Sequence, residues 1–148
     1  RKQAVSYDIY LKDPVTKEIL EVENPHFMRG GMYMVGGCRE LWLNITYNYS
    51  RWYYKKGVFP PSKNNADETS EGIRSIYSLT GAESIPILKH AITTLTSTKE
   101  DLTKEEKQKY KDLGADSYWL PSRENAIKPL CQLLAMALMR PDGIWDGD

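Results

Sequence analysis

The first indication of the fold class is a polar and aromatic segment, Asn44-Ile45-Thr46-Tyr47-Asn48-Tyr49-Ser50-Arg51-Trp52-Tyr53-Tyr54. With Leu41-Trp42-Leu43 before it, the segment alternates with period 2 as far as Ser50, which is the pattern of a half-buried β-strand. One side is aliphatic and aromatic: Leu41, Leu43, Ile45, Tyr47 and Tyr49. The other side carries an indole, amides and hydroxyls: Trp42, Asn44, Thr46, Asn48 and Ser50. We predict a strand from Glu40 to Tyr49, which can continue to Tyr54 after a bend and whose polar face suits a small ligand.

Earlier residues predict the rest of a small sheet. Alternation over residues 4–12, a turn at Asp13-Pro14 and a return over 18–23 predict an N-terminal hairpin. A short run at 32–35 between two glycine pairs predicts another strand. The sequence therefore predicts a mainly antiparallel sheet of about four strands in the N-terminal third.

The later residues predict helices that cover this sheet. A polar, aperiodic stretch at 57–70 predicts a loop that can order over a ligand or partner. Helical spacing follows it. It predicts a short helix capped by Ser70 and closed at Gly81, and then a helix over 83–95. Two further helices are predicted: one over 103–110, with a capping box at Thr103 and Glu106, and one over 122–140, capped by Ser122. After a Pro-Asp-Gly turn, Trp145 is expected to dock. The fold class is thus α+β, with one domain over 1–148 that is strand-rich over 1–56 and helical over 71–148.

Composition limits the class of partner. The 148 residues include 20 Lys and Arg against 20 Asp and Glu, so no basic surface predicts binding to duplex nucleic acid. No apolar run is long enough for a membrane span, and no secretory signal core is visible, so a cytoplasmic location is expected. Cys38 and Cys131 lie far apart and are expected to be free thiols in a reducing compartment.

Known catalytic and metal-binding motifs are missing from the sequence. Neither His26 nor His90 has a metal-ligand spacing, and no nucleophile-elbow, phosphate-loop or dinucleotide pattern occurs. Asp142, Asp146 and Asp148 lack the spacing of a calcium loop. We predict no cofactor, no metal and no catalytic residues, which favours a binding protein over an enzyme.

Candidate ligand-binding residues combine aromatic rings with arginines and amides. Stacking on a base is assigned to Trp52, Tyr54 and Trp119, and contact with phosphate to Arg51, Arg74 and Arg123. Polar edges of the ligand are assigned to Asn44, Thr46, Asn48 and Asn125. The alternative for the aromatic cluster is core or subunit packing, because aromatic side chains bury large areas and favour strands. We expect the polar strand face to meet Arg74 and the helix start at 119–125.

Three segments resemble a small protein family that recurs in bacteriophage and prophage genomes. They are Asn44-Ile45-Thr46-Tyr47-Asn48-Tyr49-Ser50, Gly81-Ala82-Glu83-Ser84-Ile85-Pro86 and the stretch Met139-Arg140-Pro141-Asp142-Gly143-Ile144-Trp145-Asp146-Gly147-Asp148. The resemblance covers the last two-thirds of the chain and implies a viral origin more than an activity. Small phage proteins without catalytic motifs are similar in kind to anti-defence sponges, which sequester nucleotide immune signals of the bacterial host.

Three functions therefore remain as hypotheses. The first is a non-catalytic protein that sequesters a cyclic nucleotide or a cyclic ADP-ribose type of signal. The second is an inhibitor that binds a host defence protein through its aromatic surface and the loop at 56–70. The third is a small nucleotide-processing enzyme that uses Glu71, Glu83, Glu124 or the terminal aspartates. Self-association is expected for all three, because many aromatic residues on few strands are hard to bury in one small domain.

Overall fold

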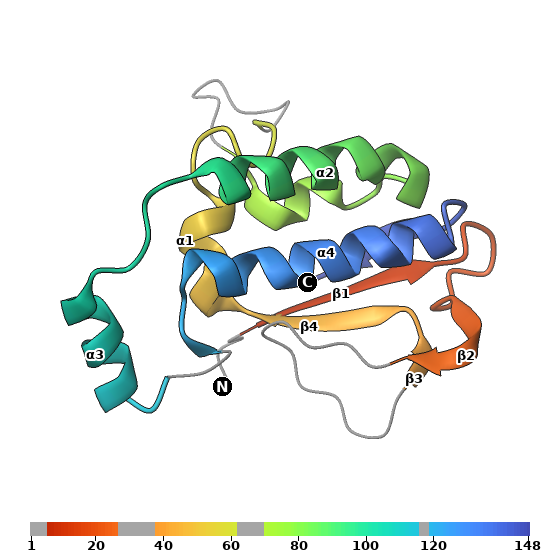
Figure 1. The fold of residues 1–148 in the computed structure, drawn as a ribbon. Coiled ribbons are helices and arrows are strands. Elements are labelled where there is room, and N and C mark those ends of the chain that lie inside the picture. The colour runs from red at the N-terminus through yellow and green to blue at the C-terminus, as the bar shows by residue number, and fades with distance from the viewer. Residues whose placement is uncertain (1–5, 27–37, 62–69, 116–118) are drawn as a thin grey trace.

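The computed structural model describes residues 6–26, 38–61, 70–115 and 119–148 (Figure 1). Its strands are β1 (Ser6–Lys12), β2 (Glu21–His26), β3 (Cys38–Glu40), β4 (Trp42–Thr46) and β5 (Ile144–Gly147). Its α-helices are α1 (Ser50–Tyr53), α2 (Gly81–Ser97), α3 (Lys104–Asp112) and α4 (Arg123–Met139), and its 3-10 helices are η1 (Tyr47–Tyr49) and η2 (Gly72–Ile76). A mainly antiparallel sheet with helices packed on it confirms the predicted α+β fold.

Strand β1 lies at the centre of the main sheet. Among the described residues the strand order is β4-β1-β5, and β1 is antiparallel to both neighbours. Ile9 of β1 is opposite Leu43 of β4, and Leu11 of β1 is opposite Trp145 of β5. All four side chains are fully buried. The alternation read from the sequence thus identifies the core face of β4 and β1 correctly.

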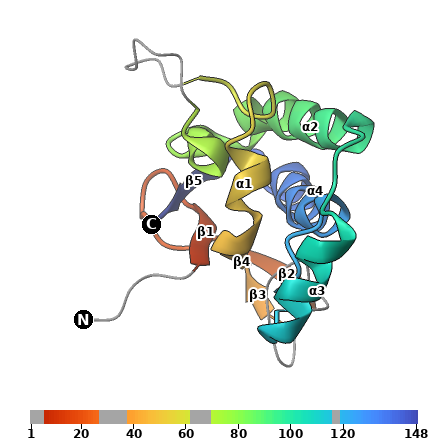
Figure 2. The same ribbon diagram turned by 90° about the vertical axis from the view of Figure 1, so that its left-hand side faces the viewer.

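Helices α2 and α4 cover that core face. They lie side by side, on the same side of the strands, in both ribbon views (Figures 1 and 2). Each helix buries a stripe with helical spacing: Leu88, Ala91 and Leu95 in α2, and Ala126, Leu130, Leu133, Met136 and Ala137 in α4. The prediction that the later helices cover the sheet is confirmed. A candidate functional site lies at one edge of the layer formed by α2 and α4.

Side-chain caps set where the helices begin. The predicted capping box at Thr103 and Glu106 is present at α3, with both hydrogen bonds at 3.1 Å, and Ser122 caps α4 as predicted. A second capping box, between Thr80 and Glu83, starts α2 at Gly81. Gly81 is therefore the first residue of a helix, and its prediction as the end of the preceding one is wrong. That preceding helix is the 3-10 turn η2.

The strand predicted to reach Tyr49 or Tyr54 ends at Thr46. There the Thr46 hydroxyl accepts a hydrogen bond from the backbone N–H of Asn48 at 3.2 Å and caps η1. Local side-chain bonds of this kind compete with strand pairing. The chain continues through η1 into α1, so the residues after Thr46 alternate in the sequence but form helical turns and not a strand.

The predicted N-terminal hairpin forms beside its turn, while most of the pairing of its two strands is with other strands. Asp13 does form the predicted turn, because its carboxylate accepts hydrogen bonds from the N–H groups of Val15 and Thr16. The two arms are joined beside this turn by the bridge between Lys12 and Ile19, where the N–H of Asp13 donates to the carbonyl of Glu18 and the N–H of Leu20 donates to the carbonyl of Leu11, both at 2.8 Å. Strand β1 pairs with β4 and β5, while β2 pairs with β3. The predicted strand at 32–35 lies outside the described residues.

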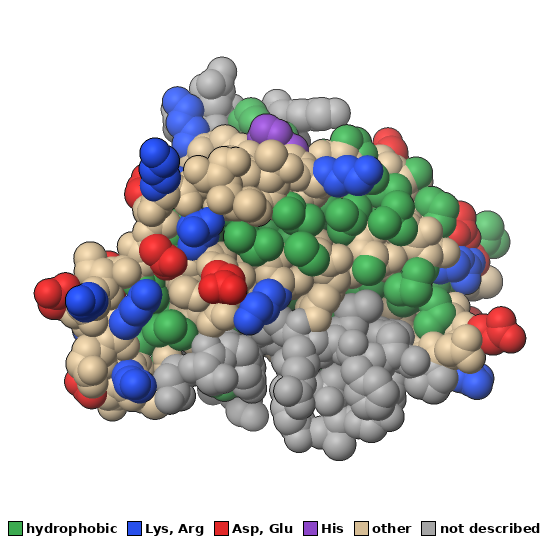
Figure 3. Space-filling view, viewed as in Figure 1, with side chains coloured by type: hydrophobic (Ala, Val, Ile, Leu, Met, Phe, Trp, Pro, Cys, Tyr) green, Lys and Arg blue, Asp and Glu red, His purple; other side chains and the backbone are tan. Residues whose placement is uncertain are grey.

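Apolar side chains also gather on the outer surface of α2 and α4, as the space-filling view shows (Figure 3). Leu138 and Met139 of α4 are 57% and 44% exposed. By contrast, the aromatic residues Tyr49, Trp52 and Tyr53 are buried, so the chain buries more of its aromatic run than the sequence suggests. Self-association remains a prediction. None of the described helices has the length and apolar character that crossing a bilayer requires.

Candidate functional site

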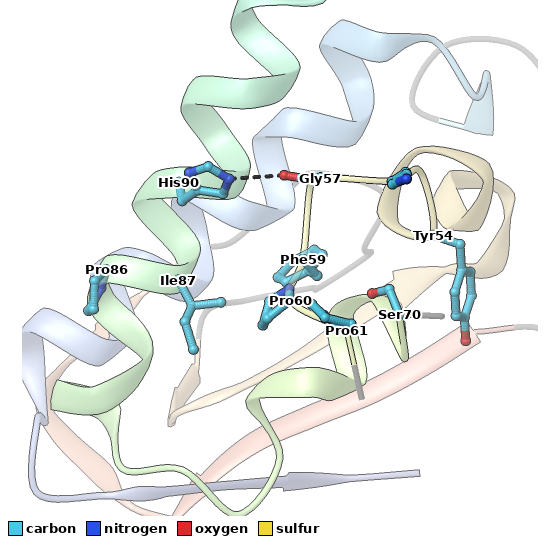
Figure 4. A pocket seen from close by; sticks show the side chains of 10 residues that line it. Tyr54, Gly57, Phe59, Pro60, Pro61, Ser70, Pro86, Ile87 and His90 are labelled. Atoms are coloured by element: carbon cyan, nitrogen blue, oxygen red, sulfur yellow. Dashed lines mark hydrogen bonds between the residues drawn. The ribbon is translucent and has the colours of Figure 1, made fainter. Parts of the chain in front are cut away.

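A hollow of the described surface lies between residues 56–61 and α2 (Figure 4). Its volume is about 870 Å³. The lining is mainly apolar and aromatic, with a few polar groups: Tyr54, Lys56, Gly57, Phe59, Pro60, Pro61, Ser70, Pro86, Ile87 and His90. We call this hollow the apolar cavity.

The walls of the apolar cavity are fixed by packing and by one hydrogen bond across its rim. Val58 and Phe59 are buried in the core and hold the segment at 56–61 against the domain. On the opposite wall, the His90 imidazole Nε2 lies 2.9 Å from the carbonyl oxygen of Gly57. Pro86 and Ile87 complete that wall from α2. Because both walls are anchored, the described part of the cavity is preformed.

A second, more polar hollow adjoins the first. It has a volume of about 530 Å³ and is lined by Tyr54, Ser70, Glu71, Arg74, Tyr77 and Ser78. Tyr54 and Ser70 line both hollows, so they form the shared wall. We call this second hollow the polar cavity.

Arg74 is the only arginine or lysine that lines the polar cavity among the described residues. Its Nε donates to the main-chain oxygen of Asp148 at 2.7 Å, and its terminal nitrogens donate to the hydroxyls of Tyr47 and Tyr54 at 3.1 and 3.3 Å. The guanidinium also lies over the ring of Tyr7, 4.8 Å from its centroid. Arg74 is in none of the ion pairs formed within the described residues. The guanidinium is thus held by an aromatic ring, two phenol hydroxyls and a main-chain oxygen.

Tyr7 and Tyr77, which lie near Arg74, stay neutral at physiological pH. Burial raises the pKa of the Tyr7 phenol to about 12 and raises the pKa of Tyr77 further. A phenol with a raised pKa is not a phenolate at pH 7, so neither residue neutralises the guanidinium. Among the described residues, the lining of the polar cavity therefore includes one cationic side chain, Arg74, and one carboxylate, Glu71.

These raised pKa values predict alkaline destabilisation. Above pH 10 a tyrosine of the unfolded chain loses its proton, whereas folded Tyr7 keeps its proton up to about pH 12. The contribution of Tyr7 to the free energy of unfolding is therefore fully present below pH 10 and decreases as the pH rises. At pH 12 the loss is about 2 to 3 kcal/mol. Urea unfolding at pH 8, 10 and 11.5 should show a shallower decline for Tyr7→Phe. Equal declines for the variant and the wild type would contradict the prediction.

Of the residues predicted from sequence, the structure brings Tyr54 and Arg74 together in the polar cavity. Trp52 is only 3% exposed, and its indole N–H donates to the carbonyl of Pro121 at 2.8 Å. Thr46 is buried and caps η1. We leave Trp52 and Thr46 out of the candidate site, because neither offers a ligand an exposed surface.

The other predicted residues tie structural elements together. Asn44 donates to Ser6 and Asp8, Asn48 to the carbonyl of Trp119, and Asn125 to the carbonyl of Leu120. Arg51 pairs with Glu106, and Arg123 donates to the carbonyls of Leu95 and Thr96 at the end of α2. The strand face does reach the segment at 119–125, as predicted, through Asn48. Arg74 lies in the polar cavity, whose described lining includes none of residues 119–125.

Sequence reasoning missed most of the apolar cavity. Phe59, Pro86, Ile87 and His90 carry no motif, and only their placement in space makes them neighbours. The one signal is the loop at 57–70, which is predicted to order over a ligand. Five of its residues line the cavity: Gly57, Phe59, Pro60, Pro61 and Ser70. Residues 62–69 lie outside the described part.

Acidic residues do not converge on a metal or catalytic site in the described ranges. No group of three or more His, Cys, Asp or Glu residues there is placed to hold a metal ion. Asp142 pairs with Arg140, and Asp146 pairs with Lys12. Comparison with protein-family models, with curated proteins and with solved structures gave no match for this chain.

Proposed function

We propose that this chain is a non-catalytic binding protein that captures a nucleotide-derived small molecule. The observation that carries the proposal is the apolar cavity, whose volume of about 870 Å³ falls in the range of about 300–1,000 Å³ typical of ligand pockets. Aromatic and proline side chains give a heterocyclic base flat surfaces for packing. The adjoining Arg74 supplies positive charge for a phosphoryl group.

The biological role we propose draws on the resemblance to phage proteins. A protein of this kind would sequester a cyclic nucleotide or a cyclic ADP-ribose type of immune signal in the cytoplasm of a bacterial host. Capture without turnover needs no general base. Two of the carboxylates that the enzyme alternative would use already have partners within the protein. Glu83 belongs to the capping box of α2, and Asp146 pairs with Lys12.

Calorimetry tests the proposal directly. The protein is titrated with cyclic AMP, cyclic di-GMP and cyclic ADP-ribose, and we expect heat of binding from at least one of them. Mass spectrometry of the recovered ligand should show it unchanged. No heat from any of the three would contradict the proposal, and a chemically altered ligand would favour the enzyme. A stable partner captured from host lysate, with no ligand bound, would favour the inhibitor.

Filling the apolar cavity should abolish this binding. Ile87→Trp places a large ring in the cavity, and we expect the affinity for the bound cyclic nucleotide to fall by about tenfold or more. Ile92→Trp is the matched control, because Ile92 is another partly buried isoleucine of α2 that does not line the cavity. Calorimetry on both variants, with melting temperatures to check folding, makes the comparison. Equal affinities would place the ligand elsewhere.

A further inference from the structure

We infer that the two cavities form one composite site, in which a nucleotide places its base in the apolar cavity and its phosphoryl group on Arg74. This inference rests on the proposed function and specifies the direction in which the ligand is bound. It assigns Arg74 as the phosphoryl-binding residue, and it assigns the wall formed by Tyr54 and Ser70 to the sugar between base and phosphate.

The shared wall places the two cavities next to each other. Tyr54 is 44% exposed and lines both of them. Its ring lies against Gly72, where an added Cβ would come within 3.2 Å of the ring. Gly72 also has a positive φ of 63°, which favours glycine. The Tyr54 ring is therefore held in place by a backbone position that has no side chain.

Arg74 has donors left for an anion after its internal contacts are made. Each terminal nitrogen of a guanidinium carries two N–H groups. Among the described residues each of them donates one hydrogen bond, to Tyr47 or to Tyr54. One N–H on each nitrogen remains, and two such donors can bind two oxygens of one phosphoryl group. The bond from Nε to Asp148 and the ring of Tyr7 hold the guanidinium in position.

The polar groups near the shared wall suit a sugar. Ser70 and Ser78 carry hydroxyls that both donate and accept, and the Glu71 carboxylate accepts from hydroxyl donors. Carboxylates bind ribose hydroxyls in this way in dinucleotide sites. Base, sugar and phosphoryl group thus each meet a matching lining.

Paired ligands test this orientation. Cyclic AMP and cyclic ADP-ribose are each compared with adenosine, and cyclic di-GMP with guanosine, by calorimetry. The wild type should bind the phosphorylated probe about 10- to 100-fold more tightly than its nucleoside. Arg74→Gln should remove that preference and leave the nucleoside affinity unchanged. Arg74→Lys, which keeps the charge, should retain part of the preference.

The controls separate binding from folding. Arg51→Gln is the matched variant, because Arg51 lies outside both cavities and pairs with Glu106; it should leave both affinities unchanged. Tryptophan fluorescence and melting temperature report whether Arg74→Gln stays folded. If it does not, the test rests on Arg74→Lys and on the difference between the affinities of the wild type for the phosphorylated probe and for its nucleoside. Equal binding of nucleotide and nucleoside by the wild type would overturn the inference and spare the proposed function. Binding of no probe at all would overturn both.

Discussion

Replacing Trp145 with alanine should lower the free energy of unfolding by about 3 to 5 kcal/mol. Trp145 is fully buried, and its indole N–H donates to the hydroxyl of Ser84 at 2.7 Å. The side chain joins β5 to α2, so its removal leaves a cavity between the sheet and the helical layer. Urea unfolding followed by circular dichroism measures the loss.

Two further variants separate the contribution of the buried Trp145 ring from that of its hydrogen bond, and test whether removing an exposed tryptophan has the same effect. Trp145→Phe keeps most of the ring volume and removes the hydrogen bond, and it should cost about 1 to 2 kcal/mol. Trp119→Ala is the matched control, because Trp119 is 39% exposed; its cost should stay below about 1 kcal/mol. Equal costs for Trp145→Ala and Trp119→Ala would mean that β5 does not dock as described.

The adjacent residues Tyr53 and Tyr54 should respond in opposite ways to alanine substitution. Tyr53 is fully buried, and its hydroxyl donates to the carbonyl of Ala126 in α4 at 2.8 Å. Tyr53→Ala should therefore cost about 3 to 5 kcal/mol of stability. Tyr54 is 44% exposed, so Tyr54→Ala should cost little stability and weaken ligand binding. Denaturant unfolding and calorimetry on both variants give the two measurements.

A reversed result would be informative. If Tyr54→Ala unfolds the protein while Tyr53→Ala does not, the orientation of α1 is different from the one described. If Tyr54→Ala leaves binding unchanged, Tyr54 is not a wall of the occupied site. Tyr53→Phe isolates the hydrogen bond to Ala126 and should cost about 1 kcal/mol.

Much of the fold follows from local patterns in the sequence. Alternation at residues 41–45 identifies the buried face of β4, and the capping residues Thr103 and Ser122 identify the starts of α3 and α4. These features depend on neighbours along the chain, so one sequence is enough to find them. The pairing of β1 with β5 is not local: it joins Leu11 to Trp145. The sequence predicts that Trp145 docks, and the strand around it emerges only in three dimensions.

The site was harder to predict for the same physical reason. Arg74 and Tyr54 come together through a hydrogen bond at 3.3 Å, and both were predicted to bind a ligand. The predicted amides and arginines elsewhere, such as Asn48 and Arg123, satisfy backbone carbonyls of the protein itself. A polar side chain that binds a carbonyl and one that binds a ligand have the same identity in the sequence. Only the arrangement of the elements separates them.

Pairing between the two distant ends of the described chain has a consequence for synthesis. The N–H of Asp8 bonds the carboxylate of Asp148, 140 positions further along, and β5 pairs with β1 next to it. During translation, β1 leaves the ribosome before β5, so it can pair with β5 only after α2 and α4 have been made. One edge of β1 stays unpaired on the ribosome for that time, and an unpaired edge is a template for aggregation. We expect the nascent protein to need a chaperone at that stage, and chains that stop before β5 to aggregate.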